Sequence, residues 1–149
     1  MRRIVGSIVV VALGVLGFAT VGGSEQTGVT RTELGRGKVG ADYTVKGGNG
    51  TDVVVQKVTI EPGATAAWHT HPGNETAVIV SGTLTFFDGD DQKCAPHEYK
   101  AGDVVVGSGH VHQGKNLGKE PVQIVVTYYN VPTGGPAATP ATRPANCPE

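Results

Sequence analysis

The sequence is poor in cysteine, and it has no cluster of basic residues interleaved with aromatic ones. Only two of its 149 residues are cysteine, Cys94 and Cys147, and neither lies near a histidine pair. This argues against a thiolate metal site. Without a basic, aromatic-rich patch, nucleic-acid binding has no support. Without an amphipathic Lys/Arg-rich segment, binding of the mature chain to a membrane surface has none either.

Beyond the first 23 residues, no stretch has a convincing helical period and no internal repeat is visible. Short β-type runs instead alternate with turns rich in Gly, Pro, Asn and Asp, as tight antiparallel connections require. We expect strands at residues 42–45, 51–60, 64–71, 75–82, 83–89, 103–107 and 121–131. The pattern predicts an all-β fold, a sandwich or barrel, and the length allows one domain.

The N-terminus carries almost no charge after its first three residues. Arg2 and Arg3 precede residues 4–21, which are nearly all apolar or small. We interpret residues 1–23 as a helical signal peptide, which predicts a secreted or extracytoplasmic protein. The alternative is an uncleaved membrane anchor, the only membrane contact that we expect. Cleavage would remove two arginines and no acidic residue, changing the formal net charge from −1 to −3.

The remaining sequence divides into three parts. We expect a flexible N-terminal arm at 24–41, a barrel at 42–131 and an extended tail at 132–149. The tail is rich in Pro, Ala and Thr and cannot pack a core by itself. An even number of cysteines in an exported chain suggests that Cys94 and Cys147 form a disulfide, which would fasten the tail, although two free thiols remain the alternative.

Histidine is rare but clustered. Four of the five histidines form two H-x-H pairs, His69/His71 and His110/His112. Residues i and i+2 of a strand share one face, so both members of the first pair can point the same way, and Glu75 returns on the next strand. Imidazole and carboxylate together suit a divalent metal, which could be iron, manganese, nickel, cobalt, copper or zinc.

The spacing of these residues resembles the two signatures of the cupin family. The first signature, G-x5-H-x-H-x3-E-x6-G, is matched by Gly63, His69, His71, Glu75 and Gly82. The second signature is matched in a degenerate form by Gly102, Gly109, His112 and Asn116, with Gly107 where a proline is usual. The departure affects the loop before His112 rather than the histidine itself.

The resemblance covers roughly residues 52–131 and implies a small single-domain cupin (cupin type 2, RmlC-like jelly-roll superfamily). It implies an antiparallel jelly-roll barrel that holds one divalent metal ion through His69, His71, Glu75 and His112. Related cupins include dioxygenases, decarboxylases and isomerases, so we expect a mononuclear metal-dependent enzyme, dioxygenase-like, with a small-molecule substrate. A non-catalytic binding module outside the cytoplasm and a purely structural metal remain alternatives. No catalytic residue is identified, and a homodimer formed through sheet edges is left open.

Several residues near the pairs have expected places as well. We expect His110 at a loop rim rather than as a hydrogen-bonding partner or alternative ligand of the site. Trp68 faces away from the ligands and is expected to pack in the barrel. Phe86 is expected in the core, and of Tyr128 and Tyr129 one must face inward because neighbours on a strand alternate.

Overall fold

The computed structural model describes residues 30–148. The expected signal peptide, residues 1–23, and its helix lie outside the described residues. Residues 32–149 form one compact unit. No helix occurs within residues 30–148, so none in this range is long and apolar enough to cross a membrane.

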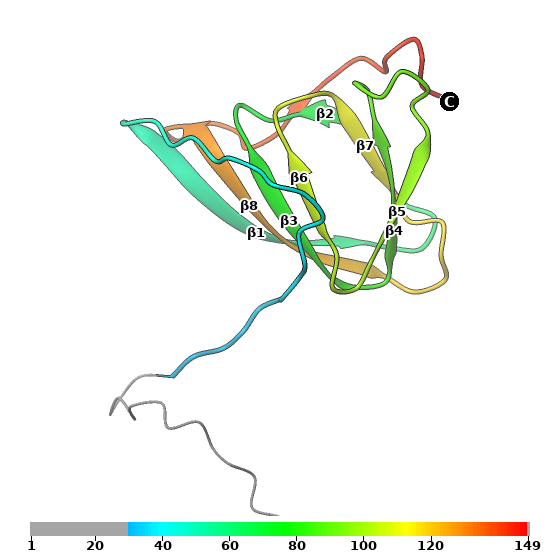
Figure 1. The fold of residues 1–149 in the computed structure, drawn as a ribbon, viewed down its shortest axis with the longest axis horizontal. Helices are drawn as coiled ribbons and strands as arrows, with labels where there is room; N and C mark the ends of the chain where they lie inside the picture. The colour runs from blue at the N-terminus through cyan, green and yellow to red at the C-terminus, as the bar shows by residue number, and fades with distance from the viewer. Residues whose placement is uncertain (1–29, 149) are drawn as a thin grey trace, which may run out of the picture. The chain divides into compact units, whose positions relative to one another are not determined.

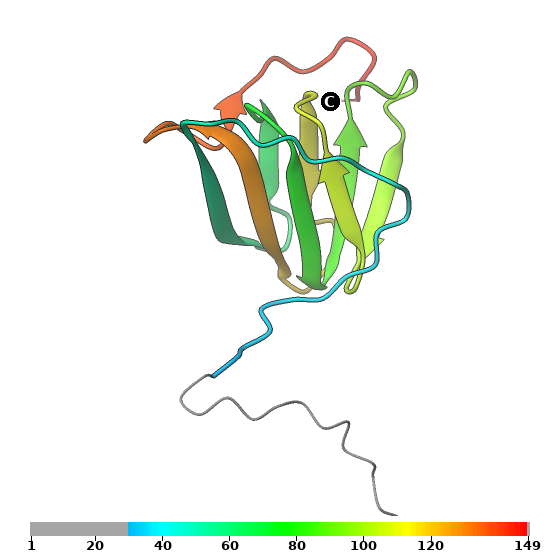
Figure 2. The same cartoon turned by 60° about the vertical axis from the view of Figure 1, so that its left-hand side comes forward.

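Nine strands make up the described part of the chain, in two sheets that face one another (Figures 1 and 2). The strands are β1 (Thr51–Ile60), β2 (Thr65–Thr70), β3 (Glu75–Ser81), β4 (Thr83–Asp88), β5 (Pro96–Lys100), β6 (Val104–Gly107), β7 (His112–Lys115), β8 (Val122–Pro132) and β9 (Thr139–Pro140). One sheet has the order β1-β8-β3-β6 and the other β5-β4-β7-β2-β9. All named strand pairs are antiparallel, which confirms the predicted antiparallel all-β fold.

The strands that the sequence does not predict are polar ones. β5, β7 and β9 have too few apolar residues to show a period of two, and they form because a neighbouring strand supplies their hydrogen bonds. The strand predicted at residues 42–45 is wrong. Residues 42–45 have no regular secondary structure, Tyr43 is exposed, and no described strand pairs with this segment. The arm is joined to the barrel at Lys38, whose N–H donates to the carbonyl of Gly102 (2.8 Å).

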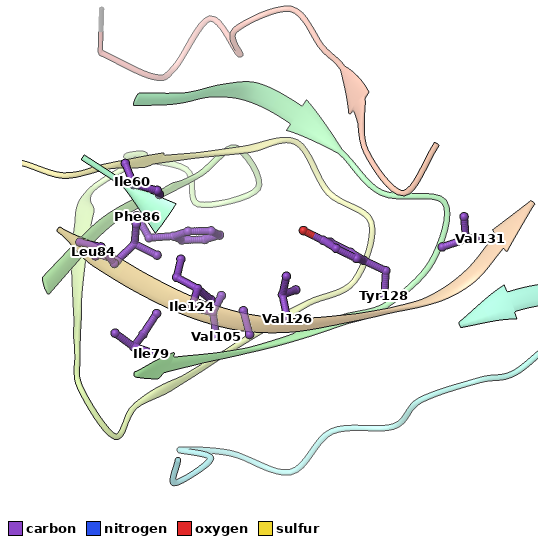
Figure 3. Close-up of a cluster of buried hydrophobic side chains, with 11 residues drawn as sticks. Ile60, Ile79, Leu84, Phe86, Val105, Ile124, Val126, Tyr128 and Val131 are labelled. Atoms are coloured by element: carbon purple, nitrogen blue, oxygen red, sulfur yellow. The ribbon is translucent and has the colours of Figure 1, made fainter. Parts of the chain in front are cut away.

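The core lies between the two sheets (Figure 3). Along β8 alternate residues point inward, which is why this strand's burial repeats every second residue. Burying each large apolar side chain contributes about 1.5–3 kcal/mol. The buried members of the core are Ile60, Ala77, Ile79, Leu84, Phe86, Val105, Val122, Ile124, Val126, Tyr128 and Val131. The inward positions expected for Phe86 and for one of the two tyrosines are therefore confirmed.

A second apolar cluster lies apart from this core. It consists of Phe87 and the disulfide between Cys94 and Cys147, with Trp68 packed against it. The disulfide is the one expected from the sequence. The expectation that Trp68 packs in the barrel is wrong, because its strand face turns outward and the disulfide-bonded tail supplies the apolar surface that it contacts.

Candidate metal centre

Strand pairing brings the four predicted ligands to one place. His69 of β2 lies opposite His112 of β7, and a register irregularity in β2 precedes His69. Glu75 begins β3 and lies opposite Gly107 of β6. His71 follows the end of β2 by one residue. The ligands thus come from both sheets, and local irregularity of this kind often adjusts the direction of side chains at functional sites.

The side chains of the four residues converge. His71 Nε2 lies 3.3 Å from His112 Nε2 and 3.3 Å from Glu75 Oε2, and His112 Nε2 lies 3.2 Å from Glu75 Oε1. The candidate ligand atoms of His69, His71 and His112 all lie within 4.8 Å of one another. His71, Glu75 and His112 are buried, while His69 is half-buried.

Each of the three imidazoles is held by its other nitrogen. The Nδ1 atoms of His69, His71 and His112 lie 2.6, 2.7 and 3.1 Å from the backbone carbonyls of Ala67, Ala137 and His110, respectively. A carbonyl oxygen can only accept, so each Nδ1 carries the proton and donates it. Each Nε2 therefore presents a lone pair, the tautomer that a metal-ligating histidine requires.

Burial disfavours charge at the centre in the absence of a cation. It lowers the pKa of His71 and, together with the neighbouring His69 and His71, lowers that of His112 to about 3. Burial raises the pKa of Glu75 to about 7. A proton on Glu75 could be donated to only one Nε2, which would leave the other lone pairs facing each other. A divalent cation can accept all of these nitrogen and oxygen lone pairs at once, so this set of ligand atoms fits a metal.

The centre opens onto an apolar cavity of about 80 Å³ inside the barrel. His69, Glu75 and His112 share its wall with apolar residues such as Phe86. Among the described residues of the wall, the only other polar side chain is that of Tyr128. Figure 3 shows the Tyr128 hydroxyl group directed into the barrel. Burial, and next the carboxyl group of Glu75, raise the pKa of this phenol to about 12, so it remains a proton donor at neutral pH.

His110 does not lie on a solvated rim. Its side chain is only 12% exposed, and its ring lies against that of His112 with centroids 5.6 Å apart. Its Nδ1 lies 3.2 Å from Ser108 Oγ. Its Nε2 lies 3.5 Å from Asp88 Oδ2 but without hydrogen-bond geometry, so among the described residues this buried nitrogen has no hydrogen-bond partner. His110 thus packs beside a predicted ligand.

Sequence reasoning missed two contributors to the centre. A Cβ atom on Gly107 would lie 2.6 Å from Glu75 Oε1, so the absence of a side chain there makes room for the carboxyl group. The motif departure at Gly107 was a visible signal of this. The second contributor is the carbonyl group of Ala137, which gives no signal because every residue has one.

Known proteins resemble this chain in sequence and in fold. The sequence matches the cupin domain family over residues 56–128. A solved cupin-like protein from Thermotoga maritima is 26% identical, with a TM-score of 0.52, over 61% of this chain and 65% of that one. An uncharacterized protein with a double-stranded β-helix domain from Klebsiella pneumoniae is 25% identical, with a TM-score of 0.50, over 75% and 84% of the two chains.

A third solved structure, the DMSP lyase DddQ from Ruegeria pomeroyi, shares the fold at 22% identity and a TM-score of 0.52, over 65% of this chain and 46% of that one. The chain spans just under two thirds of the Thermotoga protein. The comparison with curated proteins gave no match. Fold and sequence match together define a small jelly-roll barrel of the cupin class. The chain contains a small cupin domain, which matches that family over residues 56–128.

Proposed function

We propose that this chain binds one divalent metal ion through His69, His71, Glu75 and His112 and acts as a mononuclear metal-dependent enzyme on a small molecule, in the manner of a dioxygenase. One observation carries the proposal: three Nε2 lone pairs and a carboxyl group converge at the wall of an apolar cavity. Such a cavity with a few convergent polar groups is typical of small-molecule sites.

The roles of the protein groups follow from their positions. His69, His71, Glu75 and His112 would hold the metal, which would supply Lewis acidity or redox chemistry to a substrate in the cavity. The apolar wall offers few hydrogen-bonding groups to a molecule in the cavity. Tyr128 can donate a hydrogen bond from its hydroxyl group to a molecule in the cavity, because its high pKa keeps it protonated.

A non-catalytic binding module is the second candidate, and the lining of the cavity favours it. Besides the predicted ligands, Tyr128 is the only polar side chain that residues 30–148 contribute to that lining. A reaction that needs a separate general acid and base therefore lacks one of its groups. Among reactions, this favours oxidative chemistry over proton-transfer chemistry.

We further propose that the chain is exported after removal of residues 1–23, with the barrel at 42–131 and the tail at 132–149 acting as one extracytoplasmic domain. The disulfide is weakly consistent with this location, because disulfides persist in oxidising compartments.

Elemental analysis of the purified chain tests the metal assignment. We expect about one divalent metal per chain in the parent, a large loss in His69→Ala, and no loss in the matched control His97→Ala, since the His97 side chain is 57% exposed and lies outside the centre. Equal metal content in the parent and His69→Ala would contradict the proposal. Oxygen consumption, screened with catechol-like and flavonoid-like compounds, then tests the reaction, and zinc as the native metal would count against redox chemistry.

A further inference from the structure

The C-terminal segment Thr133–Pro148, here called the tail strap, crosses one end of the barrel (Figures 1 and 2). Its strand β9 extends the sheet beyond β2, with Pro140 opposite His69 and Thr139 opposite Thr70. The N–H of Ala141 donates to the carbonyl of Trp68 (2.9 Å). The strap thus pairs with the part of β2 that carries the first predicted ligand.

The strap also contacts a second ligand directly. His71 Nδ1–H donates to the carbonyl of Ala137 at 2.7 Å, and the Ala137 methyl group packs against the main core. His69 and His112 differ from His71 in this respect. Each of them donates to a carbonyl two residues away in its own segment, so their tautomers do not depend on the strap.

Both ends of the strap are fastened. One end continues directly from β8, and the other is bonded through Cys147 to Cys94. Asn146 Nδ2 adds a hydrogen bond to the carbonyl of Asp91 (2.8 Å). Because the strap has few apolar residues, burial alone contributes too little free energy to offset the conformational entropy lost when the strap becomes ordered. Attachment at both ends reduces that entropy loss.

We propose that the tail strap is part of the metal centre, and that the Ala137 carbonyl positions His71 for ligation by fixing its Nδ1–H tautomer and ring orientation. The inference rests on the proposed metal function of this site. In a metal-ligating histidine, one imidazole nitrogen binds the metal and the other makes a hydrogen bond. Removing the partner of that hydrogen bond typically lowers metal affinity 10- to 100-fold. The disulfide acts on His71 only indirectly in this arrangement. It holds the strap in place, and the strap in turn positions the carbonyl group of Ala137.

The test compares the parent with a chain that ends at Gly134 and carries Cys94→Ser. Zinc titration of both metal-free proteins should show 10- to 100-fold weaker binding without the strap. Nitrogen-15 spectra of the imidazoles in the metal-free proteins provide a second readout. We expect the shortened chain to lose the pure Nδ1–H tautomer at His71, while His69 and His112 keep theirs as internal controls. Zinc affinity within twofold of the parent, or an unchanged His71 tautomer in a folded chain, overturns the proposal.

If the shortened chain does not fold, the full chain with Cys94→Ser and Cys147→Ser takes its place. The same selective change at His71 and a smaller loss of zinc affinity support the proposal, and an unaltered His71 with unaltered affinity refutes it. The two proposals fail differently. A parent that binds no zinc or other divalent metal refutes the proposed function, whereas a parent that binds zinc as tightly as its strapless variant refutes only the role of the strap.

Discussion

Gly107→Ala should weaken metal binding without touching any predicted ligand. Gly107 lies opposite Glu75 in the pairing of β6 with β3. An added Cβ would lie 2.6 Å from Glu75 Oε1 and 2.8 Å from its Cγ. An ordinary contact is about 3.5 Å, so the carboxyl group must move by about 0.9 Å or the strands must separate. Glu75 has little freedom to move, because its two oxygens lie within 3.3 Å of His71 and His112.

The magnitude follows from this displacement. A ligand moved by close to 1 Å leaves the geometry that a metal site requires, and we expect zinc affinity to fall about 10- to 100-fold, or roughly 1.4–2.7 kcal/mol. Overpacking should lower the free energy of unfolding by about 1–3 kcal/mol as well. Calorimetric titration of the metal-free protein with zinc measures the first quantity, and urea unfolding measures the second.

Gly40→Ala is the matched control for this substitution. A Cβ atom built on Gly40 meets nothing within 4 Å, so both quantities should stay at the parent's values. If Gly107→Ala folds and binds zinc as tightly as Gly40→Ala, Glu75 is not a ligand or its carboxyl group is free to move, and the reasoning fails.

Three further predictions concern stability. Asn116→Ala should lower the free energy of unfolding by about 2–3 kcal/mol, because the buried amide makes three hydrogen bonds with the backbone. Zinc affinity should stay unchanged. Urea unfolding measures the first quantity and zinc titration the second. Reducing the disulfide, which spans 53 residues, should cost about 4 kcal/mol in the chain-entropy model, and the denatured, unreduced chain should show no free thiol. The metal-free chain should lose stability as the pH falls from about 6.5 toward about 4.5. Burial lowers the pKa of His71, and it lowers that of His112 to about 3, so the unfolded chain binds imidazole protons more readily than the folded chain. Burial also raises the pKa of Glu75 to about 7, so the folded chain retains a proton there and part of the loss is offset. A urea-unfolding stability that does not change across this window would contradict these shifts.

How far the sequence predicts this structure depends on whether a residue's role is local. The period of two along β8 marks its buried face, because this pattern depends on strand geometry alone. The short spacing of His69, His71 and Glu75 keeps these residues near one another along the chain. Strand β5, with the sequence PHEYK, escaped prediction because its stability comes from pairing with β4 rather than from its own composition.

Roles that depend on distant segments could not be predicted. The outward packing of Trp68 depends on a disulfide between residues 53 positions apart. The tail was expected to be extended and only fastened by Cys147, yet Ala137 contacts His71 across a sequence distance of 66 residues. Nothing in a Pro- and Ala-rich composition identifies which carbonyl group will meet which imidazole.

The proline in β9 has a consequence for how copies of this chain can associate. β9 is the last strand on its side of the five-stranded sheet, and Pro140 within it has no N–H to offer a further strand. An edge that ends in a two-residue strand with a proline resists growth by addition of a strand from another molecule. The tail therefore protects the ligand-bearing β2 from edge-to-edge aggregation. A homodimer built through a sheet edge would have to use another one, such as the long edge strand β1.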